Sequence, residues 1–173
     1  MDSRPRHKIL MSACLLGERC RFDGQAKPYA AAQRLFAAHP DGVVPVCPEV
    51  MGGLPCPRTA SEIDAAAPEL RVVDAAGTDR TQAFVQGAVA CRYLAEELNV
   101  RVAVLKAKSP SCGSGRIYDG SFTGTLVDGW GVAAGVLDAA GLTVIDEDRL
   151  AALEAAGRAE DLFCATVPED LDD

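Results

Sequence analysis

The sequence has few aromatic residues, only two histidines and no long hydrophobic run. Aromatic side chains make up 5% of the 173 residues. With two histidines, His7 and His39, no Ser-His-Asp arrangement can be argued, and neither histidine lies in a cysteine-rich turn. No stretch approaches the roughly 20 apolar residues of a membrane span. These absences disfavour a histidine-dependent hydrolase and a membrane protein.

Positive charge is also scarce. Seventeen Lys and Arg residues oppose twenty-five Asp and Glu residues, which gives a net charge of −8. The negative electrostatic field of such a protein repels phosphate backbones, so we expect no general nucleic-acid binding. A small, uncharged substrate fits this charge better. The apolar stretch before Cys14 covers only residues 9–13, shorter than the ~7 to 15 residues of a signal sequence. We therefore expect a cytoplasmic protein.

Cysteine, in contrast, is abundant, with seven residues. A chain of this length buries roughly 70% of its unfolded surface, so it needs no disulfide or metal merely to fold. Disulfides are rare in a reducing compartment, where cysteines in turns more often bind metal or perform chemistry. The paired C-x2-C spacings of a structural zinc site are absent.

Hydrophobic periodicity predicts strands that alternate with helices. Strands are expected at residues 7–13, 42–47, 100–107 and 142–146, with 70–75 as a further edge strand. Helices are expected at residues 28–38, 79–98, 129–140 and 148–156. This order predicts a single α/β domain with a mostly parallel sheet between helices, a Rossmann-like three-layer fold. We expect this domain at residues 8–165, between an N-terminal tail, 1–7, and an acidic C-terminal tail, 166–173.

Three cysteines lie at or just after predicted strand ends, namely Cys14, Cys47 and Cys112. Ligands of such sheets bind outside the carboxyl ends of the strands, so these thiols can meet at one rim. Small or rigid neighbours, including Pro48 and Gly113, leave backbone N–H groups free to contact a cluster. Each cysteine alone could equally be a small buried hydrophobe. Together they favour a metal or cluster site, and three thiolates from distant loops suit a cubane with one open iron.

The other four cysteines differ in position. Cys91 lies on the apolar stripe of the predicted helix 79–98, and Cys164 lies near the C-terminus, so both are expected to serve packing. Neither Cys20 nor Cys56 follows a predicted strand. Each could be a fourth ligand or a resolving thiol.

Four segments resemble the successive motifs of a widespread bacterial family, long of unknown function, that contains thiouracil desulfidase. They are "SACLLGERCRFDG", "VPVCPEVMGGLPCPR", "KSPSCGSGRIYDGSFTG" and "GWGVAAGVLDAAGLTVIDE", and the similarity runs from about residue 8 to 147. The resemblance implies an enzyme that converts 2-thiouracil to uracil and hydrogen sulfide. It also implies a [4Fe-4S] cluster held by Cys14, Cys47 and Cys112.

The resemblance further indicates an acidic residue at Glu49 and a serine at Ser109 as catalytic residues, with Ser111 as the other candidate serine. Glu49 would carry protons; its alternative roles are an N-cap or a salt bridge with Arg58. Ser109 could orient substrate or form only a turn hydrogen bond. Ser111 and Asp23 are expected to contact substrate, although Asp23 could be only a turn residue.

Two other kinds of function remain open at this point. A non-enzymatic iron-sulfur sensor or carrier could use the same cluster, but the sequence shows no DNA-binding element. A thiol enzyme could use Cys112 as nucleophile without a cluster, with Lys106 or Lys108 as the positive partner of its thiolate. The expected partner is a small thionated pyrimidine, and the sequence carries no signal for an oligomeric state.

Overall fold

The main sheet consists of four parallel strands. In this computed structural model, which describes residues 7–164 and 167–171, they are β1 (Ile9–Ser12), β2 (Val43–Val46), β5 (Val102–Leu105) and β8 (Thr143–Asp146). Their order is β2-β1-β5-β8, and every neighbouring pair is parallel. The predicted α/β fold with a parallel sheet is therefore confirmed.

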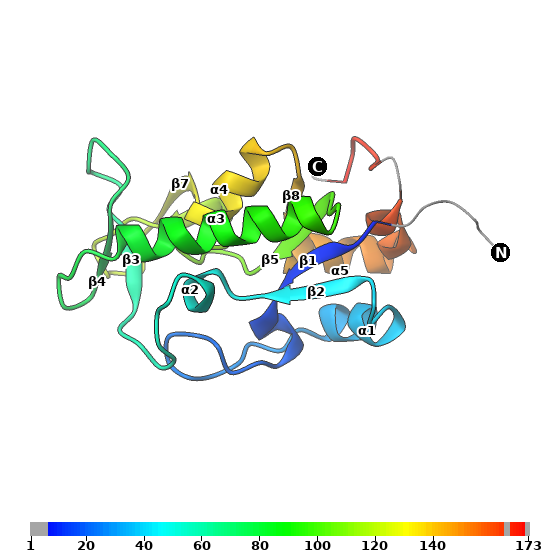
Figure 1. Cartoon of the computed structure of the whole chain (residues 1–173), viewed down its shortest axis with the longest axis horizontal. Coiled ribbons are helices and arrows are strands. Elements are labelled where there is room, and N and C mark those ends of the chain that lie inside the picture. Colours follow the sequence, from blue (N-terminus) through cyan, green and yellow to red (C-terminus); the bar gives the residue numbers. More distant parts are fainter. Residues whose placement is uncertain (1–6, 165–166, 172–173) are drawn as a thin grey trace.

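Helices cover both faces of this sheet (Figure 1). Helices α1 (Ala30–Ala38) and α5 (Glu147–Ala155) pack on one face. The other face carries α3 (Thr81–Glu97) and α4 (Val132–Ala139), which pack against each other. Among the described residues, no helix is long and apolar enough to cross a bilayer.

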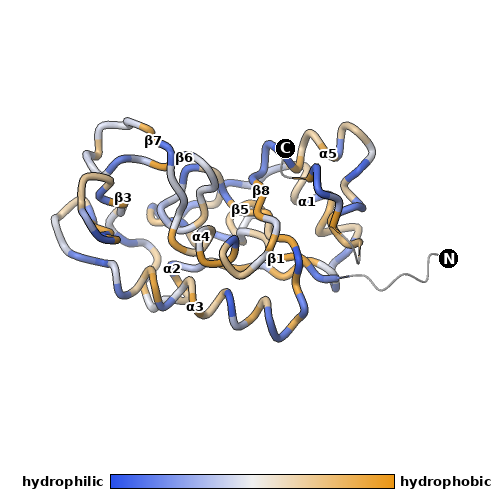
Figure 2. Tube along the Cα trace, turned by 90° about the horizontal axis from the view of Figure 1, so that it is seen from above, coloured by the Kyte–Doolittle hydropathy of each residue, from blue (hydrophilic) through white to orange (hydrophobic). Residues whose placement is uncertain are grey.

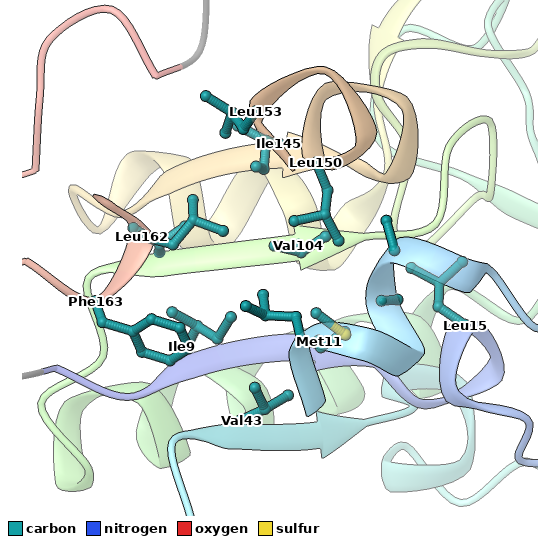
Figure 3. Packing of buried hydrophobic residues seen from close by; sticks show 14 of the residues in the cluster. Ile9, Met11, Leu15, Val43, Val104, Ile145, Leu150, Leu153, Leu162 and Phe163 are labelled. Carbon is teal, nitrogen blue, oxygen red and sulfur yellow. The ribbon is translucent and has the colours of Figure 1, made fainter. Parts of the chain in front are cut away.

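Alternation along the strands divides the core between the two faces. In β1, Ile9 and Met11 join the cluster beneath α1 and α5, which also contains Leu150 (Figure 3). Leu10, between them, joins the cluster beneath α3 and α4, together with Ala103. Figure 2 shows hydrophobic colour concentrated at the strands and polar colour on outer turns of α3. Each large apolar side chain buried in this way contributes about 1.5–3 kcal/mol.

The predicted edge strand at 70–75 was wrong in its placement. Its central part, β4 (Val72–Asp74), pairs antiparallel with β3 (Ser61–Ile63) in a separate two-stranded sheet. The predicted helix at 129–140 also starts too early, because Gly129 and Trp130 end a strand, β7 (Leu126–Trp130). This strand pairs with β6 (Ser114–Tyr118).

The two antiparallel hairpins lie at the end of the molecule toward which the parallel strands point (Figure 1). Glu62 of β3 joins them, because its Oε1 accepts hydrogen bonds from the amides of Gly120 (3.0 Å) and Phe122 (3.1 Å). Ile63, Ile117 and residues of α3 and α4 form a small core beneath them. The carboxyl ends of the strands therefore face a second layer of structure.

Described residues near the C-terminus are packed against the domain. Leu171 is fully buried in the cluster beneath α1 and α5, and its carbonyl accepts a hydrogen bond from Arg149 Nε (2.8 Å). The predicted boundary at 165 and 166 and residues 1–6 of the predicted N-terminal tail lie outside the described residues. The division into a domain and two tails stays a prediction. The other short elements are η1 (Ala13–Leu16), α2 (Pro48–Met51) and η2 (Ala159–Phe163).

Candidate active site

The three strand-end cysteines lie in the segments that follow three adjacent strands. Cys14 is in η1, directly after β1; Cys47 follows β2 and precedes α2; Cys112 is in the turn after β5. The chain runs from β1 outward to β2 and then returns to β5 on the other side of β1. This reversal of direction is a topological switch point, where open α/β sheets bind ligands.

All three cysteines line one cavity of about 470 Å³. Glu49, Ser109 and Ser111 line the same cavity. Seven residues were predicted to bind the cluster, act in catalysis or contact substrate, and the structure brings six of them together around one cavity. The seventh, Asp23, does not line the cavity, and its carboxylate accepts the amide of Gln25 (3.0 Å) in a local turn.

The turn that carries Cys112 is fixed by the start of α4. The amide of Val132 donates to the carbonyl of Pro110 (2.9 Å), and the amide of Ala134 donates to that of Ser111 (3.0 Å). Gly131 permits this approach, because a Cβ there would lie 2.6 Å from the carbonyl carbon of Ser111. Position 131 therefore has room only for glycine.

The short helix α2, which carries Glu49 and follows Cys47, lies against α3 through two glycines. A Cβ on Gly52 would overlap the backbone of Ala83, and a Cβ on Gly87 would overlap the carbonyl of Pro48. The two backbones are in direct contact here. This contact with α3 fixes the position of α2, the helix that carries Glu49.

Glu49 is held from both sides. Its Oε1 accepts a hydrogen bond from Arg58 Nε (3.1 Å), and its Oε2 accepts one from the hydroxyl of Ser111 (2.9 Å). The side chains of Arg58 and Glu49 are 6% and 14% exposed, so this ion pair is largely shielded from water. Arg58 also donates to the carbonyls of Pro55 and Cys20. The salt bridge considered from the sequence is therefore present, and it fixes Glu49 inside the cavity.

Ser109 and Ser111 have different surroundings. Ser109 Oγ accepts the amides of Ser111 (3.2 Å) and Cys112 (3.1 Å), so it stabilises the turn. Ser111 is 2% exposed, and its Oγ lies 3.0 Å from Ser109 Oγ and 3.6 Å from Cys112 Sγ. Its single proton goes to Glu49, because the carboxylate is the stronger acceptor and the nearer atom. Of the two serines, Ser111 is the one in direct contact with both Glu49 and a cysteine.

Three of the thiols around the cavity, those of Cys20, Cys47 and Cys112, have pKa values above that of an ordinary cysteine. Burial raises the pKa of Cys112 to about 11, despite a hydrogen bond with Ser12 that opposes the shift. A hydrogen bond with Cys14 raises the pKa of Cys20 to about 11, and one with Cys20, together with burial, raises that of Cys47. Metal binding at this site must therefore displace protons from thiols.

The arrangement does not converge on a single point. Within residues 7–164 and 167–171, no group of three or more His, Cys, Asp or Glu side chains is placed to hold a metal ion. The thiols of Cys14, Cys47 and Cys112 instead surround a common space. A sulfur donor set spread around a cavity suits a soft metal cluster larger than one ion.

Several cavity residues were not singled out from the sequence as part of a site. Ser12, the last residue of β1, accepts the amide of Lys106 (2.8 Å) and contacts Cys112, and its strand-end position could have identified it. Tyr118 comes from β6, which was not predicted, so no sequence signal led to it. Phe22 and Lys27 come from the irregular segment before α1.

The chain is similar to known proteins. The chain matches the model of the 2-thiouracil desulfurase family over residues 9–149. It is 38% identical over 149 residues to the uncharacterized protein YbbK of Bacillus subtilis (strain 168), a match that covers 82% of this chain and 97% of YbbK. Among solved structures it is similar to the [4Fe-4S]-dependent thiouracil desulfidase TudS, with a TM-score of 0.78 and 41% identity, over 87% of this chain and 97% of that chain. The resemblance carried by the four sequence motifs is thereby confirmed, and the chain belongs to the 2-thiouracil desulfurase family.

Proposed function

We propose that this protein is a [4Fe-4S]-dependent desulfidase that converts 2-thiouracil, or a related thionated base, and water to uracil, or the corresponding base, and hydrogen sulfide. In this proposal Cys14, Cys47 and Cys112 hold the cluster and Glu49 carries protons. The observation that carries the proposal is that these three thiols and the Glu49–Ser111 pair line one cavity at the switch point of the sheet.

The residues present fit such a cluster. Three sulfur ligands reach the cavity from separate loops, and sulfur ligands favour iron-sulfur clusters. A cluster bound there would supply a Lewis-acidic iron without a protein ligand, with affinity for the soft thiocarbonyl sulfur. The overall reaction exchanges sulfur for the oxygen of water, so it needs no external oxidant or reductant.

The protein's own groups would manage the protons. Glu49 accepts a proton from the attacking water and donates one to the departing sulfur or to a ring nitrogen, which is general acid-base catalysis by one carboxyl group. Ser111 and Arg58 each bind one of its oxygens and fix its direction. Burial of the ion pair keeps bulk water from competing for these contacts. Ser109 acts in this scheme by holding the turn of Ser111 and Cys112.

The alternatives from the sequence are less well supported. A cluster-free thiol enzyme needs Cys112 as a thiolate, but burial raises the pKa of this thiol, and Lys106 Nζ is already bound to Glu147 Oε1 at 2.6 Å. A sensor or carrier needs no acid-base residue, whereas Glu49 is fixed inside the cavity. Unpaired thiols at all seven cysteines suit a reducing, cytoplasmic setting.

Anaerobic reconstitution with iron and sulfide, followed by incubation with 2-thiouracil, tests the proposal. Wild type should bind a [4Fe-4S] cluster and release uracil and sulfide in equal amounts. Cys112→Ala should lose both the cluster and turnover. Cys91→Ala is the matched control, since Cys91 is equally buried but does not line the cavity. A fully loaded wild type that releases no sulfide from 2-thiouracil would contradict the assignment to this substrate, and failure to bind a cluster would contradict the cofactor.

A further inference from the structure

A fourth thiol faces the same cavity. Cys20 lines it together with Cys14, Cys47 and Cys112. The three cysteines assigned to the cluster thus have a neighbour of the same chemistry. Four thiolates are the usual ligand set of a [4Fe-4S] cluster.

Backbone contacts hold Cys20 in this position. Its carbonyl accepts hydrogen bonds from Arg58 Nη2 (3.0 Å) and from the thiol of Cys47 (3.6 Å). Two residues further on, the carbonyl of Phe22 accepts the amide of Arg58 (2.7 Å). The segment is therefore tied to the same arginine that holds Glu49, and it lies beside the cavity.

Cys20 differs from the other three cysteines in the secondary structure that holds it. Cys14 belongs to η1, Cys47 precedes α2 directly, and Cys112 is in a turn held by the start of α4. Cys20 instead belongs to segment 17–29, which is described throughout and contains no helix or strand. A ligand on such a segment can leave the metal while the other three stay in place.

The remaining three cysteines, Cys56, Cys91 and Cys164, do not line the cavity. Cys56 is exposed and does not line the cavity, and its thiol donates to the carbonyls of Arg19 (3.0 Å) and Arg21 (3.3 Å). Cys91 is buried on α3, with its thiol 3.6 Å from the sulfur of Met51. Neither thiol faces the cavity that holds the other four.

We propose that Cys20 is a fourth, displaceable thiolate ligand that covers the open iron when substrate is absent. This inference rests on the proposed cluster and deepens it. On arrival of the substrate, the thiocarbonyl sulfur would replace the Cys20 sulfur on the iron, and the released thiolate would take a proton from solvent water to become a thiol. No oxidant or reductant is consumed. The exchange would shield the cluster from oxidation between turnovers without blocking the reaction.

The test compares anaerobically loaded wild type, Cys20→Ala and Cys56→Ser during mild oxidation with ferricyanide. Serine at position 56 keeps a donor for the carbonyls of Arg19 and Arg21. Loss of one iron to give a [3Fe-4S] cluster is followed by electron paramagnetic resonance and by iron release. Cys20→Ala should lose this iron readily, while wild type and Cys56→Ser should retain it.

A measurement on wild type alone keeps the proposal testable if Cys20→Ala folds poorly. Mössbauer spectra of the 57Fe-loaded protein should show four equivalent thiolate-bound irons before 2-thiouracil is added and one distinct iron afterwards. A distinct iron already present without substrate, or equal iron loss in wild type and Cys20→Ala, would overturn the role of Cys20 while leaving the proposed function intact. A wild type that binds no cluster would overturn both.

Discussion

Ser111 donates a hydrogen bond of 2.9 Å to Glu49 although the two residues are 62 positions apart in the chain. Ser111 is placed by the turn after β5 and Glu49 by α2, which follows β2. The contact closes one wall of the cavity between two cysteine-bearing loops. Any change that moves one of these loops therefore also moves the Glu49 carboxylate.

Glu49→Gln should abolish most turnover without removing the cluster. Glutamine keeps the size of the side chain and can still contact Ser111, but it cannot exchange protons. Loss of general acid-base catalysis lowers kcat by roughly 100- to 10,000-fold. Uracil and sulfide release, measured beside iron content, checks this. Unchanged turnover at full iron loading would exclude Glu49 as the proton carrier.

The two serines should separate activity from stability. Ser111→Ala removes the hydrogen bond that directs the Glu49 carboxylate, while Arg58 still binds the other oxygen, so it should mainly lower kcat. Ser109→Ala leaves the amides of Ser111 and Cys112 without their acceptor and should lower the free energy of unfolding by about 1–3 kcal/mol. Urea unfolding of the cluster-free proteins and kcat of the loaded ones provide the comparison. The reverse pattern would assign the catalytic contact to Ser109.

A methyl group at Gly87 should disturb the site from outside it. Gly87→Ala forces the backbones of α3 and α2 apart at Pro48, and overpacking of this kind costs about 1–3 kcal/mol. Cluster uptake should also fall, because Pro48 directly follows Cys47.

Gly135→Ala is the matched control for this change. Position 135 is inside α4, and a Cβ there meets only Trp130 Cβ at 3.6 Å. Alanine should stabilise that helix by about 0.5–1 kcal/mol. Thermal unfolding and iron content are measured for both variants. Equal melting temperatures and equal iron contents would contradict the inference that α3 positions α2.

Asp74 should contribute to the loss of stability in acid. The amide of Thr78, then Arg80 and the amide of Ala76, lower the pKa of Asp74. Because the folded pKa is below the unfolded one, this stabilisation is present above the unfolded pKa of about 3.9 and is lost as the pH falls through the folded value. Asp74→Asn should unfold more easily at neutral pH and depend less on pH below about pH 4. Asp128→Asn, at a position with a 94% exposed side chain, should behave as wild type in the same melts.

The sequence allowed the parallel sheet to be predicted because its strands are short apolar runs that any buried parallel strand requires. The predicted ends of these strands placed Cys14, Cys47 and Cys112 at one rim of the sheet. The hairpins could not be foreseen in the same way. Strand β6 contains Gly115 and Arg116 and lacks an apolar alternation, so tertiary pairing with β7 determines its conformation. The placement of Ser111 rather than Ser109 against Glu49 depends on the same three-dimensional packing.

The position of the cysteines after β1, β2 and β5 has a consequence for biogenesis. No two of these three thiols are close in the chain, so the unfolded polypeptide offers an incoming cluster no local binding motif. The parallel strands must align before the thiols share a cavity, and such nonlocal pairing is slow to form. If these thiols hold the proposed cluster, the acceptor for its delivery is the folded apoprotein, and maturation follows folding.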